Sequence, residues 1–203
     1  MNLPQGTSPE SDGSSVPGLL TRLKTPVESD WHRLLTLYGP VVLFWCRLRG
    51  LQSDRIADVF AAVFRAVAVG ITEIEEQLSL GSFRNWIRTI TQKIVDETLN
   101  DGTAGPTDVA AAALAGEAPA NALPELVAQQ GSAAEDVLLM RQALDLVRSE
   151  FDAVTFDAFA KSTLERQPVA TVASNLCIPP HKVRVARSRV LHRLREEFGP
   201  LLD

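Results

Sequence analysis

Apolar side chains recur at intervals of three or four residues through most of the chain, and this periodicity constrains the fold more than any other feature. Such spacing is typical of helices that bury one face, because side chains three and four positions apart lie on the same side of a helix. The stripes occupy residues 30–50, 53–70, 82–100, 133–148, 151–165, 169–176 and 180–198. The sequence therefore predicts an all-α fold.

Three of these helices precede residue 100, and local signals mark their ends. Ser29 or Asp30 is suited to cap the first helix and Gly50 to end it, whereas Pro40 predicts a kink or a division into two helices. Ser82 is placed to cap the third helix. Because each apolar stripe can be buried only against the others, residues 29–100 are expected to form one compact helical domain.

The segments outside this domain differ in composition. Residues 1–28 are rich in Ser, Pro, Gly and Thr, which predicts a disordered tail. Residues 101–132 combine acidic residues with Ala, Gly and Pro and no wide apolar stripe, which predicts a linker. Residues 133–203 regain the helical pattern. The expected architecture is two small helical domains joined by a linker.

The second domain contains a helix-turn-helix pattern. A short helix over residues 169–176 precedes a turn of about three residues and a longer helix that starts at Pro180. The longer helix has one apolar stripe, predicted to pack on the short helix, formed by Val183, Ala186, Val190, Leu194 and Phe198.

The other face of this longer helix is strongly basic. The chain has a net charge of -5, yet residues 161–198 contain eight basic and three acidic residues, and no acid occurs between Lys182 and Arg195. A solvated face would carry mixed charges, with acids one turn before bases. A polyanion responds to the local charge within a Debye length of roughly 8 to 10 Å, so we expect this face to bind duplex DNA.

The planar guanidinium of arginine can form two parallel hydrogen bonds to guanine or to a phosphate. The side chains in the first turns of a recognition helix point at base edges. We therefore expect Arg184, Ser188 and Arg189 to approach bases, and the later or flanking basic residues to hold the phosphates. The predicted duplex-binding residues are His181, Lys182, Arg184, Val185, Arg187, Ser188, Arg189 and Arg193.

Taken together, the stretches "DVFAAVFRAV", "GSFRNWIRTIT" and "LERQPVATVASNLCIPPHKVRVARSRVLHRLREEF" resemble the extracytoplasmic-function (ECF) class of bacterial sigma factors, particularly a planctomycete-like branch. The resemblance covers residues 30–100 and 133 to the end. It implies that the first domain binds the clamp helices of the largest subunit of the RNA polymerase core and opens the downstream promoter element. It implies that the second domain reads the upstream element of promoter DNA as duplex. An anti-sigma factor is a further candidate partner.

The resemblance also assigns residues to the first domain. The polymerase-facing helix corresponds to Asp54, Asp58, Ala61, Ala62 and Arg65, although the family usually has polar residues where Ala61 and Ala62 stand.

The promoter-opening helix of the family corresponds to Arg84, Trp86, Arg88 and Lys93, but its later basic run is replaced here by residues such as Asp96 and Glu97. Trp86 is either a platform for an unstacked base or a core residue. The arginines and Lys93 are candidate phosphate contacts.

Nothing in the sequence favours an enzyme, a cofactor or a metal. There is no phosphate-binding glycine loop, and His32, His181 and His192 lack metal-ligand spacing. Cys46 and Cys177 are expected to be buried thiols in a reducing, cytoplasmic setting. The longest apolar runs are too short to span a bilayer.

Two alternatives stay open beside a sigma factor: a degenerate sigma-like regulator that binds DNA without initiating transcription, and a helical protein-interaction adaptor.

Overall fold

The computed structural model describes residues 18–74, 82–100 and 125–202, with side chains from residue 133 onward in the last range. Within these ranges the residues form helices with short turns between them and no strand, which confirms the all-α prediction. Residues 1–17 of the predicted tail and 101–124 of the predicted linker lie outside this description. The elements are α1 (Leu19–Arg22), α2 (Glu28–Leu48), α3 (Ser53–Gly70), α4 (Phe83–Leu99), α6 (Glu125–Arg148), α7 (Ala153–Phe159), a π-helical turn η2 (Ala160–Leu164), α8 (Val169–Asn175) and α9 (Pro180–Leu202).

Most of the helix boundaries follow the local signals. The hydroxyl of Ser82 accepts a hydrogen bond from the amide of Asn85 at 3.3 Å, so Ser82 caps α4 as predicted. Gly50 has φ of 76°, a left-handed conformation that suits the residue just after α2. The predicted cap of α2 is wrong, because the helix already begins at Glu28. α2 also continues as one helix through Pro40, so the predicted division does not occur.

The predicted tail extends too far into the chain. α1 lies within it, and Leu19, Leu20 and Leu23 are all buried in the core. Three leucines in five residues form an apolar cluster of their own, which the polar composition of the preceding residues conceals. Gly18 permits this docking, because a Cβ there would lie 2.6 Å from the carbonyl oxygen of Glu196 in α9.

The predicted linker also ends too late. α6 starts at Glu125, and its first two turns occupy positions assigned to the linker. A glycine within the helix, Gly131, weakens the local helical signal. Packing of the following turns on α2 and α9 compensates for this weak propensity.

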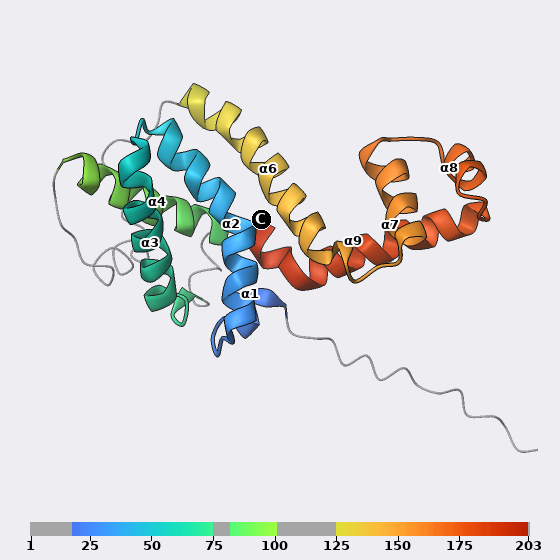
Figure 1. Cartoon of the computed structure of the whole chain (residues 1–203), viewed down its shortest axis with the longest axis horizontal. Coiled ribbons are helices and arrows are strands. Elements are labelled where there is room, and N and C mark those ends of the chain that lie inside the picture. Colours follow the sequence, from blue (N-terminus) through green and yellow to red (C-terminus); the bar gives the residue numbers. More distant parts are fainter. Residues whose placement is uncertain (1–17, 75–81, 101–124, 203) are drawn as a thin grey trace, which may run out of the picture.

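The apolar residues gather in two clusters that divide the molecule differently from the predicted domains. The larger one combines α1 to α4 with α6, the second half of α9 and Phe159 of α7, and so includes Phe83, Leu139 and Phe198. The smaller one joins α7, α8 and the first half of α9 around Val172 and Val183. Figure 1 shows α7, α8 and the start of α9 projecting from a body made by the other helices, with the long α9 reaching back to α2.

Candidate nucleic-acid interface

In the projecting part of the molecule a short helix, a turn and a longer helix follow one another, in the order expected of a helix-turn-helix. α8 and α9 are separated by four residues, Leu176 to Pro179. Cys177 in this turn has φ of 53°, and the following amide of Ile178 donates to the carbonyl of Ala173 at 3.0 Å, which closes the end of α8. Because Val172 and Ala173 pack with Val183, the outward side of α9 is fixed relative to α8.

The apolar stripe of α9 is buried as predicted, although its packing partners change along the helix. Val183 and Ala186 belong to the small cluster with α8, whereas Val190, Leu194 and Phe198 belong to the larger core. The prediction that the whole stripe packs on the short helix therefore holds only for its first half. This arrangement anchors the far end of α9 in the body and leaves its first turns to project.

Most of the predicted duplex-binding side chains lie on the open face of these first turns. The exposed residues are His181, Lys182, Arg184, Val185, Ser188 and Arg189, while Arg187 is half-buried. Val185, at 52% exposure, places an apolar side chain among these basic side chains. Within the part of the chain that the structure describes, no carboxylate is at ion-pair distance from Lys182, Arg184, Arg187 or Arg189.

The nearest negative influence on this face comes from the start of α7. Asp152 caps α7 by accepting a hydrogen bond from the amide of Thr155 at 2.8 Å. Hydrogen bonds from the side chain and backbone of Thr155 lower the pKa of Asp152, and the charge of Arg189 adds a smaller effect in the same direction. Arg189 is thus close enough to interact electrostatically with the carboxylate of Asp152, although the two do not form an ion pair.

Arg193 does not belong to the open face, and in this conformation its guanidinium is engaged within the protein rather than available for the predicted DNA contact. Its guanidinium donates to Glu150 at 2.5 Å and to Glu197 at 3.1 Å. These carboxylates raise the pKa of Arg193, with the hydrogen bond from Glu150 as the largest cause. Arg193 lies on nearly the same side of α9 as Arg189 but one turn further along, where Glu150 and Glu197 are within reach.

Glu197 forms the centre of a buried charge cluster at this end of α9. It is 1% exposed and lies 2.6 Å from Arg22 of α1 and 3.0 Å from Arg33 of α2, in addition to Arg193. Burial raises the pKa of Glu197, but the hydrogen bond from Arg22 and the charges of the three arginines outweigh it and lower the pKa overall. The cluster stabilises the contact between α9 and the first helices.

Comparisons with protein-family models, curated proteins and solved structures found no match to this chain. The functional interpretation consequently depends on the residues themselves.

The predicted promoter-opening residues of α4 are mostly engaged within the protein. Trp86 is 7% exposed and packs on Phe83 with ring centroids 5.6 Å apart, so it is a core residue and cannot stack on a base in this conformation. Arg84 and Arg88 are bound to carboxylates of α6. Lys93 is half-buried and, among the described residues, has no ion-pair partner.

The predicted polymerase-facing residues lie mainly on one exposed side of α3. Asp54, Asp58, Ala61 and Arg65 are exposed and are spaced by three or four residues. Ala62 differs, because it is half-buried and packs against the core. The structure therefore brings together four of these five residues on an accessible face.

Sequence reasoning missed an apolar groove between α6 and the end of η2. It has a volume of about 600 Å³ and is lined in part by Val137, Met140, Leu144 and Leu164. Val137 is 67% exposed, although its spacing with Met140 and Leu144 resembles a core stripe. The sequence signal for this groove is that apolar residues occupy a wide part of the surface of α6. One contact with the core cannot bury all of them.

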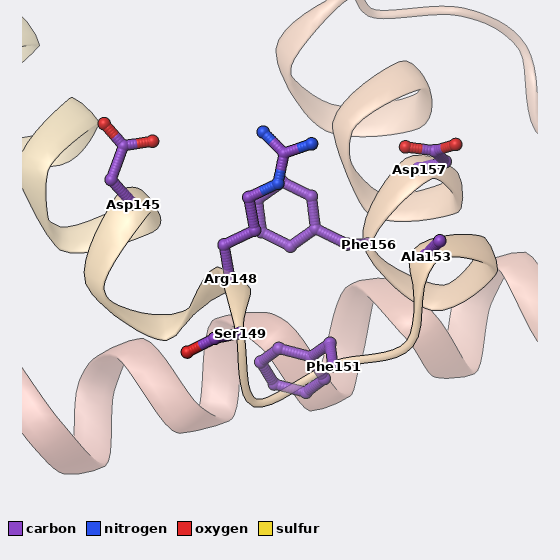
Figure 2. A pocket seen from close by; sticks show the side chains of 7 residues that line it. All are labelled: Asp145, Arg148, Ser149, Phe151, Ala153, Phe156 and Asp157. Atoms are coloured by element: carbon purple, nitrogen blue, oxygen red, sulfur yellow. The ribbon is translucent and has the colours of Figure 1, made fainter.

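A second hollow of about 400 Å³ lies where α6 turns into α7. Figure 2 shows the guanidinium of Arg148 over the ring of Phe156, and the two groups are 5.3 Å apart. This cation–π contact joins the end of α6 to the helix that supports the helix-turn-helix. Asp145 and Asp157 lie on opposite sides of the arginine in the same view.

Over the described ranges, no group of three or more His, Cys, Asp or Glu side chains is placed to hold a metal ion. No helix in the same ranges is both long and apolar enough to cross a membrane.

Proposed function

We propose that this protein is a sigma factor that resembles the ECF class and directs bacterial RNA polymerase to promoters from within the cytoplasm. In this proposal the first half of α9 enters the major groove of the upstream promoter element. Arg184, Ser188 and Arg189 contact base edges or the adjacent phosphates, and His181, Lys182 and Arg187 hold the phosphates. The protein has no catalytic role of its own, because polymerase supplies the chemistry.

One observation carries the proposal: the basic side chains at the start of α9, which are exposed except for the half-buried Arg187, have no carboxylate partner among the described residues. Leaving several cations together is electrostatically unfavourable, since like charges repel. Elsewhere in the same helix, Arg193 is neutralised by two carboxylates. The contrast favours a polyanionic ligand for the first turns, where DNA phosphates would supply the missing negative charge.

The exposed side of α3 supports the polymerase part of the proposal. Asp54, Asp58 and Arg65 offer polar contacts around the small side chain of Ala61, which permits close approach of another helix. α3 and the start of α9 lie at opposite ends of the molecule in Figure 1. The two surfaces can therefore engage polymerase and duplex DNA at the same time.

A DNA-binding regulator without initiation activity is a second candidate. It is favoured by the state of α4, where Trp86 is buried and Arg84 and Arg88 are bound internally. A regulator of this kind would need the α9 face but not the α4 face.

The deciding experiment combines selection of duplex DNA with transcription. Duplexes that bind the purified full chain are selected from a random library, joined to a reporter template and transcribed with bacterial core polymerase. Transcripts that start at a fixed distance from the selected sequence support the sigma factor. Sequence-specific binding without transcripts supports the regulator, and the absence of both supports a protein-interaction adaptor.

The matched variants are Arg184→Ala and Arg47→Ala. Both remove one exposed arginine, but Arg47 lies on α2 in the body of the molecule. Arg184→Ala is expected to weaken binding to the selected duplex by about 5-fold to 150-fold, which corresponds to about 1 to 3 kcal/mol. Arg47→Ala is expected to leave it unchanged, and an equal loss in both variants would contradict recognition by α9.

A further inference from the structure

The basic side of α4 is covered by two elements from the C-terminal half of the chain. α9 packs on α4, and α6 reaches α4 through charged side chains. Tyr38 of α2 is fully buried beside this junction and donates its hydroxyl proton to the carbonyl oxygen of Leu201. The last turn of α9 is thereby held against the helices that surround α4.

Arg84 is bound on both sides of its guanidinium. Nη1 donates to Asp136 of α6 at 2.5 Å, and Nη2 donates to the carbonyl oxygen of Leu202 in α9 at 2.5 Å. The side chain of Arg84 is only 15% exposed, whereas that of Asp136 is 57% exposed. Both terminal nitrogens of the guanidinium, which would bind a phosphate, are therefore engaged within the protein.

Arg88, one turn further along α4, is bound in a similar way. It donates to Glu135, and its guanidinium lies 5.4 Å from the centre of the Trp45 ring. The indole nitrogen of Trp45 donates to the other carboxylate oxygen of Glu135 at 2.7 Å. Glu135 is 2% exposed, so both donors are needed to offset the cost of burying its charge.

We propose that Glu135 and Asp136 form an autoinhibitory clasp, in which two neighbouring carboxylates of α6 occupy the arginines of α4 that would otherwise bind the phosphates of opened promoter DNA. This inference rests on the proposed function of α4 in promoter opening. A single strand and α6 cannot bind the same guanidinium groups together, so DNA binding by α4 requires the clasp to open. The apparent affinity for single strands is then reduced by the fraction of molecules that are open.

The clasp also explains how one chain can hold an exposed duplex-binding face and a covered single-strand face. The first turns of α9 are free while its last turn is docked beside α4. Duplex recognition is thus available in the closed form, and strand capture is delayed. Any partner that draws α6 away from α4 would release Arg84 and Arg88 together.

The test compares Asp136→Asn with Asp145→Asn in the full chain. Both changes remove one negative charge from an exposed position on α6, but of these two aspartates only Asp136 is paired with an arginine of α4 among the described residues. Binding of a labelled single-stranded oligonucleotide is measured by fluorescence anisotropy. Opening is measured separately by hydrogen exchange of the α4 amides without DNA.

Asp136→Asn is expected to speed exchange in α4 and to tighten oligonucleotide binding by up to about fivefold beyond Asp145→Asn, which is the range for one partly exposed ion pair. Unchanged exchange and unchanged binding would overturn the clasp and leave duplex recognition by α9 untouched. Faster exchange with no oligonucleotide binding by either variant would overturn the strand-capture role proposed for α4, and with it the autoinhibition.

Discussion

Arg189 and Arg193 lie one helical turn apart on α9, yet only Arg193 is bound to carboxylates of its own chain. Arg189 is exposed and, in the described part of the protein, lacks an ion-pair partner. The boundary between the projecting surface and the anchored part of α9 therefore falls between these two residues. Equivalent substitutions at the two positions should have different consequences.

Arg189→Ala is expected to weaken duplex binding without changing stability. A base contact would cost about 1 to 3 kcal/mol, whereas a phosphate contact would reduce the salt slope of binding by about one. Fluorescence anisotropy with the selected duplex at several salt concentrations measures both quantities. Coincident binding curves for the variant and the unaltered protein at every salt concentration would rule out a DNA contact.

Arg193→Ala is expected to destabilise the fold and to leave duplex affinity unchanged at equal concentrations of folded protein. The change removes hydrogen bonds to the carboxylates of Glu150 and Glu197, and such charged bonds contribute about 1.5 to 3 kcal/mol. Urea denaturation gives the change in the free energy of unfolding. If the variant instead lost duplex affinity and kept its normal stability, Arg193 would have to contact DNA in the complex.

Glu197→Gln is expected to lower the free energy of unfolding by about 3 kcal/mol at neutral pH, because it leaves a cluster of arginines without its central negative charge. The pKa of Glu197 is lower in the folded state than its ordinary value of about 4.3. Its contribution is therefore complete above that ordinary value and is lost as the pH falls through the folded pKa.

Denaturation of Glu197→Gln over a pH series tests this dependence. The difference from the unaltered protein should be constant near neutral pH and shrink in acid. Glu196→Gln is the matched control, since Glu196 pairs only with the exposed His192 among the described residues. A difference that persists unchanged in acid would show that the charge of Glu197 is not its source.

The sequence predicted most of the helices, although not α1, and the open face of α9, because these features depend on local information. Val183, Ala186 and Val190 have the spacing of a buried stripe. The run of basic residues without an acidic residue is visible in the sequence itself. The fate of Arg84, Arg88 and Arg193 could not be predicted in this way. Each of these arginines pairs with a carboxylate at least 43 positions away in the sequence. The pairs are Arg193–Glu150, Arg88–Glu135 and Arg84–Asp136.

The exposure of the two cysteines was predicted only in part. Cys46 is buried as expected, but Cys177 is exposed, so that part of the prediction is wrong. The apolar residues around Cys177 suggested that its thiol would be buried with them. The chain instead leaves α8 at Leu176, and the left-handed backbone of Cys177 turns its thiol outward.

Val183→Asp is expected to unfold the helix-turn-helix, because Val183 is fully buried among Val172, Ala173 and Ala186 and a carboxylate there would have no partner. Val185→Asp is the control on the same helix, since Val185 is 52% exposed. Hydrogen exchange of α8 in the full chain reports the local unfolding. Slow exchange in α8 of Val183→Asp would contradict the packing described here.

The two thiols provide the last prediction. Burial raises the pKa of the Cys46 thiol to about 11, so it is neither accessible nor ionised near neutral pH, whereas Cys177 is exposed. A thiol reagent should therefore modify Cys177 rapidly in the native protein and Cys46 only after unfolding in urea. Cys177→Ser should abolish the rapid reaction and keep the slow one. Rapid modification of Cys46 in native Cys177→Ser would mean that the core between α2 and its neighbours opens far more readily than its packing indicates.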